Sequence, residues 1–346
     1  MIKRDAYHIA IVGATGAVGI EILRVLERRN FPVASLKLLA SARSVGKKLH
    51  FRNQEHTVEH LGTESFHGVD IAFFSAGATR SREFAPFAVK AGAVVIDNSS
   101  AFRMDADVPL VVPEINREDL HEHNGVIANP NCSAAILGVP LWPLHQQARI
   151  KRIIVSTYQA ASGAGAQAML ELEEQARQFA RGEKIKKEIF PHQIAFNVFS
   201  HNTQVGENGY NDEENKIIQE TRKIFHEPHL SILPTCIRVP VLRAHSESVV
   251  IETEKYLSAN QAREILENAP GVKVIDNIEA NHFPMPIEAA GRLEVLVGRI
   301  RQASDDTHAL ALFISGDQLL KGAAWNAVQI AEELVAMEAT ASLQNL

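Results

Sequence analysis

A glycine-rich turn near the N-terminus constrains the fold of this chain more than any other stretch. Residues 9–12 are an unbroken apolar run, as expected of a strand buried on both faces of a parallel sheet. Glycines follow in the spacing G-x-x-G-x-x-G, at Gly13, Gly16 and Gly19, and the next nine residues are amphipathic. Between a strand and a helix, such glycines let the backbone approach a pyrophosphate at the helix N-terminus. The pattern predicts a dinucleotide-binding unit.

The alternation of strands and helices continues after this turn. Apolar runs predict strands at 36–40, 70–74, 93–97 and 126–128, and residues 83–91 read as a helix despite an internal proline. Strands that alternate with helices indicate a doubly wound parallel sheet. The first part of the fold is therefore expected to be α/β.

Beyond residue 146 the pattern changes to alternating strands, which indicates a second, α+β domain. The expected elements are strands at 152–159, 235–242, 248–254, 293–300 and 310–315, and helices at 166–181, 212–225, 261–268 and 323–339. Asn211 or Asp212 is expected to cap the second of these helices. The last helix can pack back on the first domain. We therefore assign residues 1–131 and 317–346 to the first domain, and 132–316 to the second.

Composition excludes several classes of protein. The formal net charge of -6 gives a nucleic-acid role no electrostatic support, and no apolar run approaches the roughly 20 residues of a membrane helix. The N-terminal apolar run is too short for a signal peptide. The two cysteines lie too far apart for a metal motif, so we expect no metal and a reduced, cytoplasmic protein.

The end of the second expected strand bears on the choice of cofactor. NAD-binding units usually carry an acidic residue there, for the ribose hydroxyls. Here the chain has Ser41, Arg43 and Ser44 and no carboxylate. An arginine between hydroxyl groups suits a 2′-phosphate, so the sequence favours NADP. The alternative is that Arg43 is a solvated loop charge.

Residues 129–133, Asn-Pro-Asn-Cys-Ser, hold one of the two cysteines. An apolar run follows and reads as a helix, with Asn131 as a plausible N-cap. Cys132 would then lie at the positive end of a helix, where its thiolate is stabilised for attack on a carbonyl carbon. The alternative is that Cys132 is a small buried apolar residue, as most cysteines outside disulfides are.

The other candidate residues indicate a catalytic site only when they are considered together, because each has an ordinary structural explanation. His245 follows Arg238 in a pattern that suits a base for the cysteine, yet most of the 15 histidines must serve packing or the surface. Glu213 and Lys216 share a helix face, which is usually an ordinary surface pair. Arg103 follows the carboxyl end of a strand, where such sheets bind ligands.

Taken together, these motifs resemble those of the aspartate-semialdehyde dehydrogenase family over nearly the whole chain. Seven stretches carry the resemblance, in order: residues 12–19, 98–104, 129–133, 158–163, 213–216, 238–248 and 321–326. The resemblance implies NADPH-dependent reduction of aspartyl phosphate to aspartate semialdehyde and phosphate through a cysteine thioester. This reaction serves the biosynthesis of lysine, threonine, methionine and isoleucine. The resemblance also implies a Rossmann-type NADP-binding domain, a catalytic and dimerisation domain, and a homodimer or dimer-based tetramer.

The resemblance also implies roles for individual residues. Cys132 is the nucleophile, His245 the acid/base, and Gln159 orients the substrate. The residues expected to bind substrate or phosphate are Arg103, Asn131, Gln159, Glu213, Lys216 and Arg238, with Arg238 on the carboxylate and Glu213 on the amine. The residues expected to bind the cofactor are Gly13, Thr15, Gly16, Ala17, Val18, Ser41, Arg43, Ser44, Ser162, Gly163 and Asn326.

Two features depart from the family pattern, and rival functions remain. The loop 199–205 matches no motif, and Ala78 stands where a second glycine is usual. The nearest rival is N-acetyl-γ-glutamyl-phosphate reductase, whose cysteine typically lies in Gly-Cys-Tyr. A non-catalytic NADP-binding paralogue would lack the cysteine or the histidine, and a thiol hydrolase would leave the glycine-rich turn unexplained.

Overall fold

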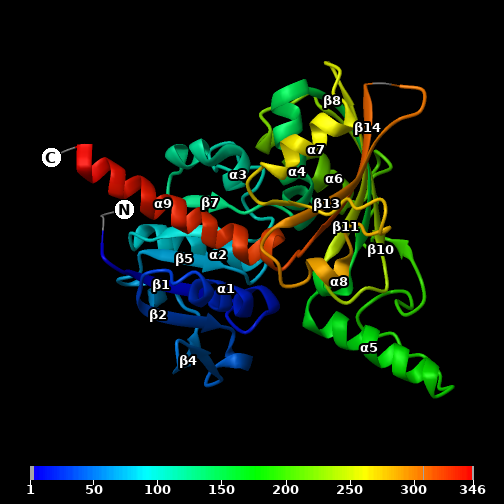
Figure 1. Ribbon diagram of the computed structural model, residues 1–346. Coiled ribbons are helices and arrows are strands. Elements are labelled where there is room, and N and C mark those ends of the chain that lie inside the picture. The colour runs from blue at the N-terminus through cyan, green and yellow to red at the C-terminus, as the bar shows by residue number, and fades with distance from the viewer. Residues whose placement is uncertain (1–3, 307, 345–346) are drawn as a thin grey trace. The chain divides into compact units, whose positions relative to one another are not determined.

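The computed structural model describes residues 4–306 and 308–344, which form two compact units (Figure 1). The first comprises Met1–Asn131 and Ala323–Leu346, and the second comprises Cys132–Gly322. The expected domain limits at residues 1 and 346 lie outside the described residues. The chain returns to the first unit at Ala323 and not at residue 317, because Asp317 is bonded within the second unit. Its carboxylate accepts from Arg243 Nε at 2.7 Å and from the Gly291 N–H at 2.6 Å.

The first unit contains a seven-stranded sheet in the order β3-β4-β2-β1-β5-β6-β7. All neighbouring strands are parallel except the β3–β4 pair. Its strands are β1 (Tyr7–Val12), β2 (Val33–Ala40), β3 (Lys48–Phe51), β4 (Gln54–His60), β5 (Ile71–Phe74), β6 (Val94–Asp97) and β7 (Val126–Ala128). Because the steps from β1 to β2 and from β5 to β6 run in opposite directions, right-handed crossovers make the sheet doubly wound, as predicted.

Sequence patterning missed the β3–β4 hairpin. Arg52 and Asn53 form its two-residue turn with φ of 47° and 62°, the left-handed pair that a type I′ turn requires. No glycine marks this turn, and the strands beside it are largely polar. The usual hairpin signal is therefore absent from the sequence.

The helices of the first unit are α1 (Ala17–Arg28), α2 (Ala78–Lys90), α3 (Pro113–Asn116) and α9 (Trp325–Gln344). Helix α2 begins earlier than the predicted residue 83, because Gly77 turns the chain at φ 86° directly after β5. Helix α9 packs on α1, α3 and β6, which confirms the expected return of the C-terminal helix (Figure 1).

The second unit contains a mixed seven-stranded sheet in the order β12-β13-β14-β11-β8-β10-β9. Only the β8–β10 and β12–β13 pairs are parallel. Its strands are β8 (Ile150–Gln159), β9 (Phe199–Ser200), β10 (Ser231–Arg238), β11 (His245–Thr253), β12 (Val272–Val274), β13 (Val295–Gln302) and β14 (Ala309–Gly316). Strand β11 begins at His245, three residues before the predicted start at 248, so His245 lies in the strand and not between the two strands predicted at 235–242 and 248–254.

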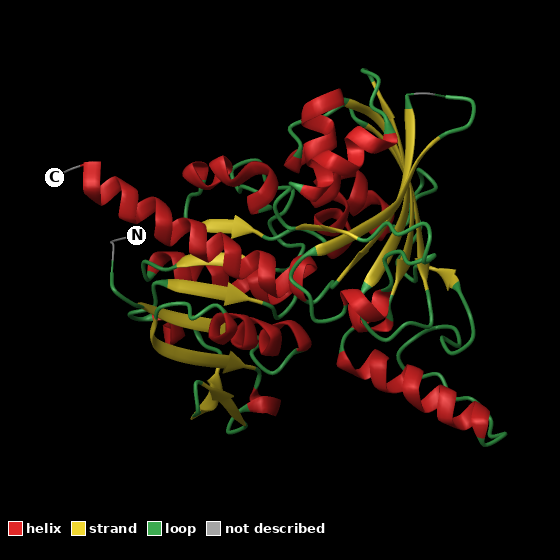
Figure 2. Cartoon of the chain, in the orientation of Figure 1, coloured by secondary structure: helices red, strands yellow, loops and turns green. Residues whose placement is uncertain are grey.

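The helices of the second unit are α4 (Cys132–Ala148), α5 (Ala166–Ala180), α6 (Asp212–Ile224), α7 (Ala259–Glu267) and α8 (Pro286–Ala289). Helix α4 packs on β8, β11, β13 and β14, and α6 packs on β10 (Figure 2). Asn211 caps α6, since its side chain accepts from the Glu214 N–H at 2.9 Å. No helix in the described part of the chain is long and apolar enough to cross a membrane.

Candidate active site

One edge of the second sheet gathers three of the predicted site residues. Strands β8 and β10 are parallel neighbours, and their last residues, Gln159 and Arg238, lie opposite each other. Strand β11 runs antiparallel to β8, so its first residue, His245, lies at the same edge, one position from the pair Ser246 and Tyr158. Strand register therefore brings together residues that are widely separated in sequence.

Cys132 is the first residue of α4 and is half-buried. A side chain on Gly322 would be impossible here, because its Cβ would lie 2.6 Å from the Cβ of Cys132. The other cysteine, Cys236, is fully buried on β10, and burial raises the pKa of its thiol. A thiolate is thus disfavoured at Cys236, whereas Cys132 lies at the end of a helix that stabilises one.

Gln159 links the start of α4 to α6. Its Nε2 donates to Ser133 Oγ at 3.2 Å and to Glu213 Oε1 at 3.1 Å. The other oxygen of Glu213 accepts from Lys216 Nζ at 3.1 Å, so the two predicted ligands on α6 form an ion pair. The structure thus brings together Gln159, Glu213 and Lys216 beside the residue that follows Cys132.

His245 is fully buried, and its two ring nitrogens differ. Nδ1 accepts from the Ala160 N–H at 3.0 Å, so the neutral ring carries its hydrogen on Nε2. Nε2 itself has no partner among the described residues. Burial lowers the pKa of His245 to about 3, and the nearby Arg238 guanidinium adds to this shift. His245 therefore presents a neutral N–H donor at the sheet edge.

Arg238 is buried and held by two acceptors. Nη1 donates to the Ala160 carbonyl oxygen and Nη2 to His201 Nε2, both at 2.8 Å. The buried Nε has no partner in the described part of the protein. Sequence reasoning missed His201, which lies in the loop 199–205. The only signal was that this loop departs from the family pattern.

The first unit contains a pocket of about 680 Å³ at the glycine-rich turn, and it suits a dinucleotide. Gly13 has φ 84°, and a Cβ there would lie 2.5 Å from the Ser75 carbonyl oxygen, so only glycine fits. The lining residues are Gly13, Thr15, Gly16, Ala40, Ser41, Ala42, Arg43, His60, Leu61, Ser75, Ala76, Arg80, Glu83 and Phe84. Five of them, Gly13, Thr15, Gly16, Ser41 and Arg43, are among the predicted cofactor ligands, and His60 and Arg80 are among those that were not. Ala17 and Val18 begin α1, and Ser44 Oγ accepts from Thr15 Oγ1 at 3.2 Å.

Other predicted ligands have structural bonds of their own. Arg103 donates to the Asn129 and Asn98 carbonyl oxygens, both at 2.9 Å, and Asn326 donates to Asn129 Oδ1 at 2.6 Å. These bonds hold the segment that leads to the buried Asn131. Ser162 accepts from Gln318 within the second unit. The ligand contacts of these residues stay predictions.

Both halves of the chain match models of one protein class. Residues 8–123 match the NAD-binding domain of semialdehyde dehydrogenases, and residues 141–321 match the dimerisation domain of the same class. The fold and the site thus define a two-domain semialdehyde dehydrogenase.

Comparison with individual relatives identifies the family within this class of dehydrogenases. The aspartate-semialdehyde dehydrogenase of Aquifex aeolicus is 55% identical over 95% of this chain and 98% of its own length. That of Bacillus subtilis is 49% identical over 94% and 97%. The crystal structure of aspartate semialdehyde dehydrogenase II from Vibrio cholerae is 43% identical with a TM-score of 0.93, over 96% of this chain and 99% of that one. The chain belongs to the aspartate-semialdehyde dehydrogenase family.

Proposed function

We propose that this protein reduces aspartyl phosphate to aspartate semialdehyde, with NADPH as reductant and phosphate as the second product. One observation carries the proposal: His245 Nε2 and Arg238 Nε are buried at one sheet edge and have no partner among the described residues. Buried donors of this kind are costly unless a ligand completes them. A substrate with a carboxylate and a reacting carbonyl oxygen supplies both acceptors.

The first half of the reaction forms a thioester. The Cys132 thiolate attacks the acyl carbon, and the phosphate leaves with the electron pair of the broken C–O bond. Arg238 binds the substrate carboxylate, because a guanidinium suits two carboxylate oxygens. Arg103 and Lys216 bind the phosphate near Asn131. As Lys216 turns to the phosphate, the substrate ammonium takes its place on Glu213.

The second half releases the aldehyde. The residues of the glycine-rich turn would hold NADPH, with Arg43 and Ser44 on its 2′-phosphate, and the bound cofactor would supply the hydride that reduces the thioester. His245 donates from Nε2–H to the oxygen on which negative charge develops. The oxygen then re-forms the carbonyl as the Cys132 thiolate leaves. This direction needs no proton transfer from the ring, so the base role of His245 in the reverse direction stays a prediction.

A burst experiment tests this function. Enzyme mixed with aspartate semialdehyde and NADP, without phosphate, should form about one NADPH per active site and then stall, because the thioester has no acceptor. Added phosphate should restart turnover. A parallel assay with N-acetyl-γ-glutamate semialdehyde separates the rival reductase, which would prefer that substrate. No NADPH formation from aspartate semialdehyde, with or without phosphate, would contradict the proposal.

The match to a dimerisation domain supports a homodimer. Alternate residues of β10 are exposed on the second sheet, Leu233 among them at 43%, and such a face would suit a second copy. A dimer-based tetramer and a cytoplasmic location stay predictions. Mass determination in solution would decide the oligomeric state.

A further inference from the structure

The loop between β9 and α6, residues 201–210, contributes a histidine to the site that no motif explains. His201 lies beside Arg238, and the charges of Glu213, Arg238 and Lys216 are close enough to affect the pKa of its ring. These are three of the residues proposed above to bind the substrate. The loop is thus placed where it can act on substrate binding.

His201 acts as an acceptor toward Arg238. Its Nε2 lies 2.8 Å from Arg238 Nη2, and since a guanidinium only donates, Nε2 must carry the lone pair. The hydrogen of the neutral ring is then on Nδ1, 3.3 Å from Thr203 Oγ1. Burial lowers the pKa of His201 to about 4, so the ring stays neutral near pH 7.

The same loop also reaches the helix that carries the proposed ammonium ligand. Thr203 Oγ1 accepts from the Glu213 N–H at 3.3 Å. A chain of hydrogen bonds therefore runs from the Arg238 guanidinium through His201 and Thr203 to the backbone of Glu213. This loop therefore links Arg238, the proposed ligand of the substrate carboxylate, to Glu213, the proposed ligand of the ammonium group on the same substrate carbon.

We propose that His201 is a positioning residue that orients the Arg238 guanidinium for the substrate carboxylate and, with Thr203, sets its spacing from Glu213. The inference rests on the proposed function and deepens it. Nη1 donates to the Ala160 carbonyl and Nη2 to His201, so rotation of the guanidinium is restricted, and Nε–H is left without a partner among the described residues. The site thereby selects substrates whose carboxylate and ammonium share one carbon.

Two substitutions at position 201 test this role, with steady-state kinetics and thermal unfolding measured for each. His201→Leu removes the acceptor, and should raise the KM for aspartate semialdehyde about tenfold or more while kcat changes less than about threefold. The KM for NADP should not change. His201→Gln keeps an acceptor at similar reach and should restore most of the affinity. His229→Leu, the same change at an exposed histidine outside the site, is the control.

A truncated substrate adds a readout that a purely structural role would not move. 3-Aminopropanal lacks the carboxylate, so the preference of the wild-type enzyme for aspartate semialdehyde over it should shrink about tenfold in His201→Leu. An unchanged KM and preference in His201→Leu would overturn the proposal. Equal losses in the Leu and Gln variants, with weaker NADP binding, would overturn it as well, by showing general damage. If the wild-type enzyme is inactive on aspartate semialdehyde, that result would instead contradict the proposed function.

Discussion

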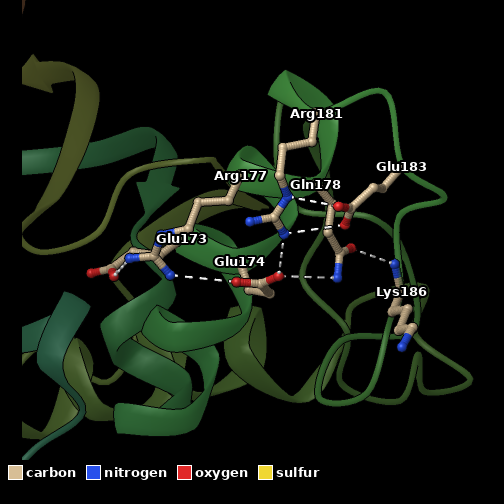
Figure 3. A network of polar contacts seen from close by, with 7 residues as sticks. All are labelled: Glu173, Glu174, Arg177, Gln178, Arg181, Glu183 and Lys186. Carbon is tan, nitrogen blue, oxygen red and sulfur yellow. Dashed lines mark hydrogen bonds and ion pairs between the residues drawn. The ribbon is translucent and has the colours of Figure 1, made fainter.

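The polar residues at the edge of the second sheet and those on α5 both form ion pairs and hydrogen bonds. The residues at the sheet edge are mostly buried, whereas most of those in the α5 network are exposed to water. Figure 3 shows the α5 network of arginine and carboxylate side chains, whose members are Glu173, Glu174, Arg177, Gln178, Arg181, Glu183 and Lys186. Arg177 is 56% exposed there, whereas Arg238 at the sheet edge is 3% exposed. Water can compete for the ion pairs of the exposed Arg177, whereas the Arg238 guanidinium is buried away from it.

This contrast indicates where function lies. Exposed ion pairs each contribute about 0–1 kcal/mol, so a dense network on a helix surface is weak evidence of a role. A buried donor without a partner is costly and persists where a ligand completes it. The sheet edge has few bonds and open donors, and α5 has many bonds and no open buried donor among its network residues. The predictions below test this difference, beginning with the largest effect.

The two cysteines provide the sharpest test. Cys132→Ser should lower turnover by at least about three orders of magnitude and abolish the NADPH burst, because a serine hydroxyl is far less ionised than a thiol near pH 7. Cys236→Ala, at the buried thiol whose pKa is raised by burial, should keep the burst. Rapid-mixing absorbance at 340 nm follows both variants. A burst in Cys132→Ser, or an acyl group on Cys236, would reverse the assignment.

The same substitution at two arginines compares the regions directly. Arg238→Lys keeps the charge but loses the planar fork, and kcat/KM for aspartate semialdehyde should fall about 10- to 100-fold, which corresponds to 1.4–2.8 kcal/mol. Arg177→Lys on α5 should leave kcat/KM within about twofold. Steady-state kinetics measure both. Similar losses in the two variants would mean that burial does not distinguish the regions.

Arg43 tests whether an exposed charged side chain can still be required for cofactor binding, because it is exposed and also lines the cofactor pocket. Arg43→Glu should lower the preference for NADP over NAD about 10- to 100-fold, because it replaces a charge-assisted contact with repulsion of the 2′-phosphate. The ratio of kcat/KM for the two cofactors is the measurement, and Arg117→Glu, at an exposed arginine outside the pocket lining, is the control. An unchanged ratio would show that Arg43 is a solvated loop charge.

Two glutamates on α5 repeat the contrast in stability. Glu171 is buried and accepts from the Glu188 N–H at 3.0 Å and from the Ile189 and Phe190 N–H groups. Glu174 is half-exposed and bonds to the side chains of Arg177, Gln178 and Arg181. Glu171→Gln should lower the free energy of unfolding by about 1–3 kcal/mol, because one of the two acceptor oxygens is replaced by an NH2 group that cannot accept from the N–H groups facing it. Glu174→Gln should change it by less than about 0.5 kcal/mol. Urea unfolding of both variants gives the comparison, and equal values would contradict it.

The lowered pKa of the half-buried His201 predicts that the free energy of unfolding depends on pH. His201 has a folded pKa of about 4, below the value of about 6.5 for an unfolded histidine, so the unfolded state binds more protons between these values. The stability that His201 contributes is complete above pH 6.5 and is lost as the pH falls toward 4. His201→Gln should flatten this loss by up to about 1.4 kcal/mol per pH unit. Parallel curves for the variant and the wild type would show that the pKa of His201 is not lowered in the folded protein.

Features that depend on a few neighbouring residues could be predicted from the sequence. The turn at Gly13, the Asn211 cap and the start of a helix at Cys132 each arise from side chains and backbone groups within one or two turns of chain. The family motifs added residues such as Gln159 and Arg238, and the structure brings these to one edge. Their contacts with substrate are not shown by the sequence pattern.

The hairpin β3–β4, the tautomer of His245 and the contact of His201 with Arg238 were decided by the tertiary structure. Arg52 and Asn53 adopt left-handed backbone without the glycine that normally signals it. The Ala160 N–H selects the His245 tautomer across 85 positions of sequence, and His201 meets Arg238 across 37. Such contacts follow from strand register, which is set by packing summed over the whole sheet, so no local pattern specifies them. By itself the sequence determined the turn, the helix starts and the residues available for chemistry, and the register of β8, β10 and β11 decided which of them meet.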